Sequence, residues 1–336
     1  MTITINRRHM LAMLGATTAI ASLPGAALGQ MQSVRIGTSS VGSVFYTLAI
    51  GAGEIIRDYA SINTTVEPVG GSAANVNGLN QGNIDLAVSN SFSSFSGYNA
   101  MYGFPQPVEV RLVLQGQPSY RWIFTRPGSG IESAQDLEGR TIVGDRRALP
   151  ELRILLDAVI EHFGLDASTI NIVETNETNE AIEAMRTGAV DAVVLPFSPR
   201  AGQIEEPISD GAMEFLKVSV EDRDAILELL PNAFYGVDQP ADDFSNQPEM
   251  IPLTSLNTYL IAHADLDDDT AYAVAKALFE NNEEFISYHA TARSWTIENL
   301  LQSPAVPFHP GVIRYLEETG HWNAELAALQ DELLAR

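Results

Sequence analysis

Residues 82–88 read GNIDLAV, and residues 188–194, about 106 positions further along the chain, read GAVDAVV. In both copies a glycine is followed three residues later by an aspartate, and the apolar residues around that aspartate predict a short buried strand. Each copy follows a predicted strand and a predicted short helix, at residues 66–69 and 73–81 for the first and at 170–173 and 179–187 for the second. The repetition predicts two similar lobes, each built on a small open sheet, although any two units of this kind can look alike.

The rest of the chain continues the alternation of strands and helices around the two copies. Residues 34–38, 64–69 and 141–144 read as strands, and residues 46–60 and 150–163 read as helices with one apolar face. Strands in series with helices between them indicate an α/β fold with an open, mainly parallel sheet in each lobe.

Further strands predict the connections between the lobes. Residues 110–115 and 120–125 read as two strands that carry the chain out of the first lobe, and residues 255–262 read as a strand that brings it back. The remaining chain reads as helices at 268–287, 310–318 and 323–335. The predicted domains are a discontinuous lobe I, residues 30–117 and 255–336, and a lobe II, residues 118–254, joined by a two-strand hinge.

Composition limits the classes of function. The 336 residues carry 43 acidic against 19 basic side chains, a formal net charge of -24, so nucleic-acid phosphates would be repelled and no nucleic-acid partner is expected. The sequence has no cysteine, which excludes disulfides, thiolate metal sites and a cysteine nucleophile. Its six histidines show no metal-binding spacing, and it has no Gly-x-Ser-x-Gly elbow, dinucleotide fingerprint or P-loop. We therefore expect no cofactor, no metal and no enzymatic activity.

The first 29 residues have the features of an export signal. Arg7 and Arg8 are followed at once by an apolar stretch, residues 10–23, and the small residues at 27–29 offer a cleavage site near Gln30. The arginine pair resembles a twin-arginine signal, although paired arginines also occur in ordinary secretion signals. We expect residues 1–29 to be a cleaved signal peptide and the mature chain to be periplasmic.

Open parallel sheets bind ligands beyond the carboxyl ends of their strands, so residues at those ends are the candidate ligand-binding side chains. Several of these ends precede helix starts, where free N–H groups and the helix dipole favour anions. The candidates are hydroxyl and amide side chains, two aromatic residues that could wall a pocket, and three arginines: Ser39, Ser40, Ser43, Phe45, Tyr46, Ser72, Asn75, Ser89, Asn90, Arg146, Arg147 and Arg200. Ser72 is also expected to cap the helix that follows it.

Arg146 and Arg147 are the sharpest of these candidates. They lie in a predicted strand-end loop of lobe II, in a chain with few positive charges, and a guanidinium can hold a carboxylate through two hydrogen bonds. The alternative is that both arginines pair locally with Asp145 or Glu151. Arg200 is a second cationic candidate.

Four stretches of the chain resemble one known family. They read IGTSSVGSVFY at residues 36–46, VGGSAAN at 69–75, GNIDLAVSN at 82–90 and PFHPGVIRY at 307–315. In this order they are similar to motifs of the TAXI-type solute receptors of tripartite ATP-independent periplasmic (TRAP) transporters. One departure is the lobe II loop, which usually reads Gly-Ser-Gly-Thr in that family and here reads GDRRALP at residues 144–150.

The resemblance implies a two-lobed, type II-like periplasmic binding fold with the ligand in the cleft between the lobes. It also implies a receptor that binds a small organic anion, such as a dicarboxylate, a keto acid or an acidic amino acid. Such a receptor delivers its ligand to TRAP membrane permease subunits that are driven by a sodium gradient, and we expect it to be a monomer.

Other functions stay open. An aromatic or hydrophobic acid could be the ligand, and Phe92, Phe95, Tyr98 and Tyr102 could then line the pocket, although such a stripe is more often core packing. The receptor could serve a sensor or an ATP-driven importer instead of a TRAP permease. A periplasmic enzyme is a more distant alternative.

Overall fold

A computed structural model of the chain describes residues 33–39 and 41–335, and the framework of this part is one sheet of ten strands. The strands lie in the order β2-β1-β3-β10-β4-β7-β5-β6, with β8 paired to β4 and β9 paired to β10. Their bounds are β1 Ser33–Thr38, β2 Asn63–Pro68, β3 Leu86–Asn90, β4 Val110–Thr125, β5 Thr141–Asp145, β6 Asn171–Glu174, β7 Ala192–Phe197, β8 Glu214–Phe215, β9 Tyr235–Gln239 and β10 Ile251–His263. The predicted signal peptide and Ser40 lie outside the described residues.

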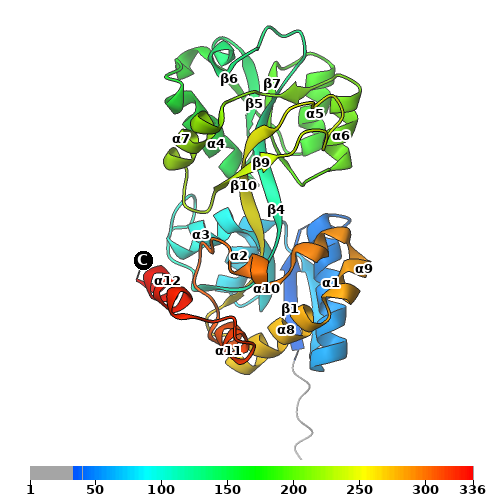
Figure 1. Ribbon diagram of the computed structural model, residues 1–336, viewed down its shortest axis with the longest axis vertical. Helices are drawn as coiled ribbons and strands as arrows, with labels where there is room; N and C mark the ends of the chain where they lie inside the picture. The colour runs from blue at the N-terminus through cyan, green and yellow to red at the C-terminus, as the bar shows by residue number, and fades with distance from the viewer. Residues whose placement is uncertain (1–32, 40, 336) are drawn as a thin grey trace, which may run out of the picture.

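Figure 1 shows two lobes, with the long strands β4 and β10 running between them. One lobe holds β1, helices α1 to α3 and the C-terminal helices, and the other holds β5 to β7 and helices α4 to α7. The helices span α1 Val44–Ala60, α2 Ser72–Asn80, α3 Ser91–Tyr98, α4 Glu151–His162, α5 Thr178–Arg186, α6 Gly202–Ser209, α7 Val220–Leu229, α8 Asp268–Glu280, α9 Asn282–Tyr288, α10 Ile297–Leu300, α11 Pro310–Glu318 and α12 Ala324–Leu334, with short 3-10 turns at η2 Ala134–Leu137, η3 Ala167–Thr169 and η4 Ala290–Ser294. Within the described part of the chain, none of these helices is long and apolar enough to cross a membrane.

The repeated Gly-x-x-Asp unit occupies the same place in both lobes. In the first lobe β1 pairs in parallel with β2 and β3, and in the second β5 pairs in parallel with β6 and β7. Asp85 Oδ2 accepts a hydrogen bond from the backbone N–H of Arg35 at 2.8 Å, and Asp191 Oδ2 accepts one from the backbone N–H of Thr141 at 3.1 Å. A guanidinium completes each site, because Arg35 and Arg126 each donate to their aspartate at 2.8 Å. The aspartates of the two Gly-x-x-Asp units therefore hold equivalent strand pairs together.

The two strands expected at residues 110–115 and 120–125 are one strand of 16 residues, β4. Gly116 and Pro118 interrupt the apolar run and suggested a break. The structure instead pairs β10 across this segment, with Asn257 opposite Pro118, and the pairing shifts register between Asn257 and Tyr259. A register shift accommodates the proline, which has no N–H to donate. The predicted lobe boundaries at 117/118 and 254/255 fall within β4 and β10 and stay predictions.

The single helix expected at residues 268–287 is two helices, α8 and α9. Asn281 separates them with a φ of -120° and a ψ of 33°, and its side-chain Nδ2 donates to the carbonyl of Ala277 at 2.8 Å. An asparagine amide that bonds a nearby carbonyl competes with the backbone for the helical hydrogen bond. The apolar periodicity continued through this position, so the break was not visible in the pattern.

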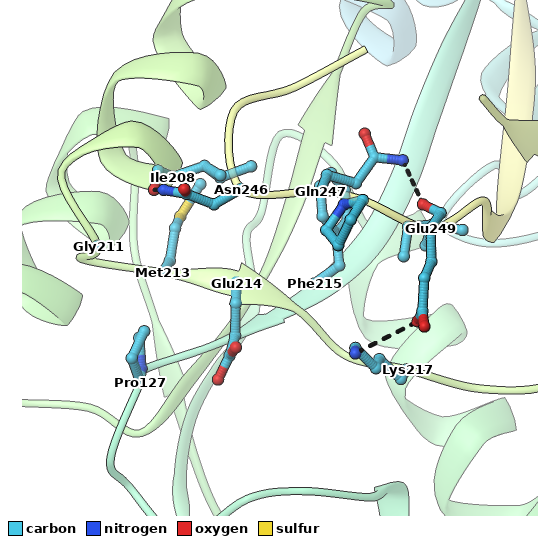
Figure 2. A pocket seen from close by; sticks show the side chains of 12 residues that line it. Pro127, Ile208, Gly211, Met213, Glu214, Phe215, Lys217, Asn246, Gln247 and Glu249 are labelled. Carbon is cyan, nitrogen blue, oxygen red and sulfur yellow. Dashed lines mark hydrogen bonds and ion pairs between the residues drawn. The ribbon is translucent and has the colours of Figure 1, made fainter. Parts of the chain in front are cut away.

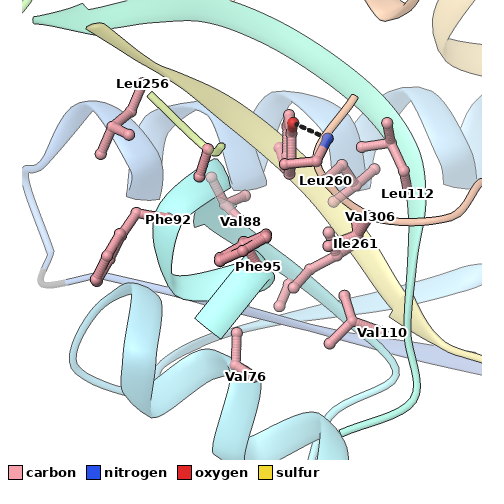
Figure 3. Packing of buried hydrophobic residues seen from close by; sticks show 14 of the residues in the cluster. Val76, Val88, Phe92, Phe95, Val110, Leu112, Leu256, Leu260, Ile261 and Val306 are labelled. Atoms are coloured by element: carbon pink, nitrogen blue, oxygen red, sulfur yellow. Dashed lines mark hydrogen bonds between the residues drawn. The ribbon is translucent and has the colours of Figure 1, made fainter. Parts of the chain in front are cut away.

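A continuous apolar core lies beneath α3 and the lobe I halves of β4 and β10 (Figure 3). Phe95 lies beside Val88 in this core, whereas Phe92 projects from the other side of α3, and both aromatic side chains are buried. Phe92 also contacts Tyr102, with their ring centroids 5.2 Å apart. Phe92 and Phe95 of the aromatic stripe considered as a pocket lining are therefore core packing, whereas Tyr98 is half-buried and Tyr102 is exposed.

The motif at residues 307–315 is bonded to strand β4 through its backbone. The backbone N–H of Leu112 on β4 donates to the carbonyl of Pro307 at 2.8 Å, and the N–H of His309 donates to the carbonyl of Leu112 at 2.9 Å. His309 is fully buried and caps α11, with its Nδ1 accepting from the N–H of Gly311 at 3.2 Å. His309 therefore holds the start of α11 against β4.

Candidate functional site

A cavity of about 380 Å³ lies between the lobes, at the carboxyl ends of the parallel strands. Its lobe I wall comes from the segments that follow β1 and β2 and from the last residue of β3. Its lobe II wall comes from the segments that follow β5 and β6 and from one residue near the end of β7, and β4 contributes two further residues. The lining residues are Ser39, Ser43, Val44, Phe45, Gly70, Gly71, Ser72, Asn90, Ser119, Arg121, Arg146, Ala148, Leu149, Asn176, Glu177, Thr178 and Pro196. This is the position at which open parallel sheets bind ligands.

Two helix N-termini at this cavity carry unused backbone donors. The N-cap of α2 is Gly71, which has no side chain. The N-cap of α5 is Glu177, whose side chain accepts no hydrogen bond from its helix within the described residues. Gly70 and Gly71 both have a φ of +126°, a conformation open to glycine and strained for other residues. Uncapped N–H groups and the positive end of the helix dipole together favour an anion.

Ser72 does not cap α2 as predicted. The N-cap is the residue directly before the first helical residue. Here Ser72 is itself the first helical residue of α2, so Gly71 is the cap. The Ser72 hydroxyl accepts a hydrogen bond from the backbone N–H of Asn90 at 3.1 Å. The side chain therefore ties the start of α2 to the end of β3 and leaves the helix terminus without a side-chain acceptor.

A buried ion pair joins the lobes beside the cavity. Arg121 on β4 is 3% exposed and Glu151 at the start of α4 is 0% exposed. Arg121 donates from Nη2 and Nε to Glu151 Oε1 at 2.9 and 3.2 Å, and Asn90 Nδ2 of lobe I donates to the same oxygen at 3.1 Å. Asn90 also caps α3, because its Oδ1 accepts from the N–H of Ser93 at 2.7 Å. Glu151 thus balances the charge of Arg121 and connects the two lobes.

Arg146 is placed very differently. Its Nη1 donates to Thr178 Oγ1 at 2.9 Å, while its Nη2 lies 3.5 Å from a carboxylate oxygen of Glu177, a side chain that is 78% exposed. Nε of Arg146 is buried and has no hydrogen-bond partner among the residues that the structure describes. Burial lowers the pKa of the Arg146 guanidinium, and Glu177 and Glu151 act against this shift, so the group stays protonated. A lining guanidinium with a weak counter-ion and unused donors is complementary to an anion.

The local pairing considered for Arg146 and Arg147 is not what forms. Glu151 pairs with Arg121. Arg147 is exposed and lines an adjoining hollow between α2 and the loop after β5, which shares Gly70, Gly71 and Arg146 with the main cavity. The cavity therefore receives Arg146 directly, and Arg147 lies toward its rim.

Of the twelve predicted residues, five besides Arg146 line the cavity and four lie elsewhere. The other two are Arg147, at the rim, and Ser40, outside the described residues. Those in the lining are Ser39, Ser43, Phe45, Ser72 and Asn90. Tyr46 is partly buried and donates its backbone N–H to Ser43 Oγ, the cap of α1, at 3.1 Å. Arg200 is 76% exposed and pairs with Asp243 at 2.6 Å in a separate hollow of lobe II. It has a φ of 54°, which turns the chain away at the end of β7.

Asn75 and Ser89 are buried instead of facing the cavity. Asn75 lies on the inner side of α2, and its Nδ2 donates to the carbonyl of Val88 at 2.7 Å. Strand β3 runs to Asn90, beyond the predicted end at residue 88, so Ser89 still lies inside the sheet opposite Tyr259. Because the strand is longer than predicted, Asn90, and not Ser89, is the residue at the strand end that lines the cavity.

Sequence reasoning missed a group of lining residues from two places. Ser119 and Arg121 lie in the middle of β4, and residues 176–178 follow β6. The run Thr175-Asn176-Glu177-Thr178 is polar and follows a predicted strand, which is the signal used for the other strand ends. Arg121 carried a weaker signal, a charged residue within an otherwise apolar strand.

Figure 2 shows another hollow, of about 160 Å³, formed by lobe II alone. Ile208, Met213 and Phe215 give it apolar walls, and Lys217 lies 3.5 Å from Glu249 at its edge. It lacks the unpaired buried donor of the cavity between the lobes. Within the described residues there is also no group of three or more His, Cys, Asp or Glu side chains that could hold a metal ion. The cavity between the lobes is therefore the candidate site.

Known proteins match the chain in family and in fold. A family model described as "NMT1-like family" matches residues 36–320. Solved structures that resemble this one include the periplasmic aliphatic sulphonate binding protein SsuA from Escherichia coli, at 17% identity over 90% of this chain and 85% of that chain with a TM-score of 0.47. Another is XAC2383 from Xanthomonas citri, solved with a bound chloride ion, at 12% identity over 89% of this chain and 99% of that chain with a TM-score of 0.51. At 12% identity the likeness to XAC2383 shows the fold alone, the α/β fold of periplasmic binding proteins.

Proposed function

The chain belongs to the NMT1-like family, and from that premise we propose that it is an extracytoplasmic solute receptor that binds a small organic anion between its lobes. The observation that carries the proposal is Arg146, a lining guanidinium with a buried, unpartnered Nε among the described residues and a weak, exposed counter-ion. The uncapped N-termini of α2 and α5 add backbone donors at the same cavity. A carboxylate or sulfonate would satisfy both features at once.

The architecture supports binding with release, without chemical change of the ligand. The cavity is bounded by both lobes, and β4 and β10 run between them as the hinge. Lobes that rotate about such a hinge can enclose a ligand and free it again. Charged hydrogen bonds contribute about 1.5–3 kcal/mol each, and a micromolar dissociation constant requires about 8 kcal/mol. One guanidinium clamp, several helix-end N–H bonds and closure would together reach that affinity.

The partner we propose is the membrane part of a TRAP transporter, because four motifs in order resemble its TAXI-type receptors. The proposed location is the periplasm, after cleavage of the leader near Gln30. An ATP-driven importer is the alternative partner. Membrane vesicles that take up the bound anion with this receptor under a sodium gradient, without internal or external ATP, would support the TRAP assignment, and strict dependence on ATP would contradict it.

The binding proposal is tested by thermal unfolding and calorimetry of the mature chain with a panel of carboxylates and sulfonates. A ligand present at about 100 times its dissociation constant adds about 2.7 kcal/mol to the free energy of unfolding. Arg146→Gln removes the clamp, so we expect the affinity for the best anion to fall about ten- to hundredfold.

Arg153→Gln is the matched control, since Arg153 lies on α4, is 41% exposed and pairs with Asp157 at the surface. It should leave the affinity unchanged within a factor of two. Equal affinities for the wild-type chain and the Arg146→Gln variant would show that Arg146 does not bind the anion, and would contradict the proposal.

A further inference from the structure

The two arginines that line the cavity differ in how much of their bonding capacity is left. Arg121 donates from Nε and Nη2 to Glu151, and from Nη1 to the Ser119 hydroxyl at 2.8 Å and the Tyr120 carbonyl at 3.0 Å. Four of the five N–H groups of a guanidinium are used in this arrangement. Arg121 therefore cannot offer a ligand the two parallel donors that hold a carboxylate.

The charge of Arg121 is also balanced locally. Its side chain and that of Glu151 are both almost completely buried, so water screens their attraction little. Glu151 Oε2 is buried as well and, within the described residues, has no donor. The Arg121 guanidinium thus already has the negative charge of Glu151 beside it, and Oε2 of that carboxylate is an unused hydrogen-bond acceptor.

Arg146 retains a positive charge for the ligand. Its Nε is unpartnered in the described part of the chain, Thr178 is a neutral acceptor, and Glu177 is 3.5 Å away and 78% exposed. Solvent weakens the attraction of such an exposed carboxylate. Arg147 adds a charge at the exposed rim, where water screens it from the interior of the cavity.

We infer that the ligand carries a net charge of -1, because Glu151 neutralises Arg121 from within and leaves Arg146 as the cation that faces the cavity. This inference rests on the proposed function and narrows it. A second negative group on the ligand would lie near the Glu151 or Glu177 carboxylate, or would have to reach the screened rim. Simple dicarboxylates are thereby disfavoured, whereas monocarboxylates, monosulfonates and amino acids of net charge -1 fit.

The direct test compares acids of equal chain length that differ in charge. We would measure by calorimetry, at pH 8 and constant ionic strength, the binding of butanoate against succinate, pentanoate against glutarate, and ethanesulfonate against ethane-1,2-disulfonate. We expect the singly charged member of any pair that binds to bind at least tenfold more tightly. Tighter or equal binding of the doubly charged members overturns the inference.

A charge variant tests the stated cause. Glu151→Gln keeps the shape of the side chain and removes its charge, so Arg121 becomes an unbalanced cation beside the cavity. In the folded variant, the affinity ratio of pentanoate to glutarate should shift at least tenfold toward glutarate. Glu161→Gln, an exposed change on the same helix, is the matched control and should leave the ratio unchanged. An unchanged ratio in folded Glu151→Gln contradicts the inference, and if circular dichroism shows that this variant is unfolded, the wild-type ratios decide.

The results separate the inference from the function on which it rests. Doubly charged acids that bind tightly and lose affinity in Arg146→Gln would leave an anion receptor and overturn the net charge of -1. Absence of Arg146-dependent binding by the six acids and by the wider panel of carboxylates and sulfonates, amino acids of net charge -1 included, would contradict both.

Discussion

Arg121 and Arg146 show how burial of the partner decides what one residue type does. Both line the same cavity, and both have a carboxylate within 4.0 Å. The partner of Arg121 is buried and shares three hydrogen bonds, whereas the partner of Arg146 is exposed and lies at the limit of hydrogen bonding. The first arginine is therefore committed to the structure, and the second is available to a ligand.

Glu151→Ala should strongly destabilise the chain. The substitution leaves the Arg121 guanidinium buried without its counter-ion and removes the acceptor of Asn90, and breaking a buried pair in this way costs about 3–5 kcal/mol. Urea denaturation monitored by circular dichroism would measure the free energy of unfolding.

Asp157→Ala is the comparison for this change, because it removes the partner of a surface pair on the same helix. It should cost about 1 kcal/mol or less. Similar costs for the two variants would show that the buried pair does not hold the lobes together.

Among the elements, those with a local signal could be predicted and those decided by pairing could not. The helix expected at residues 46–60 is α1, and the two Gly-x-x-Asp units lead into β3 and β7 as the repetition predicted. Residues 116–118 contain a glycine and a proline, yet they lie inside β4 because β10 pairs across them. Sheet pairing over long sequence separation is invisible to local pattern.

The candidate site divides in the same way. Ser39, Ser43 and Arg146 follow strands that the pattern identified, so their place in the cavity could be expected. Ser89 was misplaced by one residue because β3 extends to Asn90. The pairing of Arg121 with Glu151 links a hinge strand to a helix 30 residues away, and a sequence carries no local signal for such a contact.

Gly116 lies in the hinge strand β4, where the neighbouring Trp295 leaves no room for a larger side chain. A Cβ added at Gly116 would overlap the indole ring of Trp295, which is buried and donates from Nε1 to Gln117 Oε1 at 2.8 Å. We expect Gly116→Ala to lower the free energy of unfolding by about 1–3 kcal/mol, because the indole must move out of a packed site.

Gly202→Ala is the matched control, since no atom of the described residues lies within 4 Å of the added Cβ and the glycine does not have a left-handed φ. It should change the free energy of unfolding by about 0.5 kcal/mol or less. Thermal unfolding of both variants would measure the difference, and a Gly116→Ala chain as stable as the control would show that the hinge packing is loose.

The whole molecule combines two similar lobes with a large excess of negative charge. Equivalent strand pairs, each held by an aspartate and an arginine, form the two halves, and β4 and β10 join them. The full sequence of 336 residues carries a formal net charge of -24. An anion must therefore be attracted locally, by Arg146 and the helix termini, against the field of the protein as a whole.

The same excess charge should make stability depend on salt. Like charges repel most strongly in the compact state, and the screening length falls from about 30 Å at 0.01 M salt to about 3 Å at 1 M. We expect the midpoint of thermal unfolding to rise by several degrees between 0.01 and 0.5 M sodium chloride. Chloride bound at Arg146 would produce a similar rise, so Arg146→Gln is the control: screening predicts the same salt response in that variant, whereas site binding predicts its loss. A midpoint that stays constant or falls with salt in the wild-type chain would show that its acidic surface does not destabilise the fold.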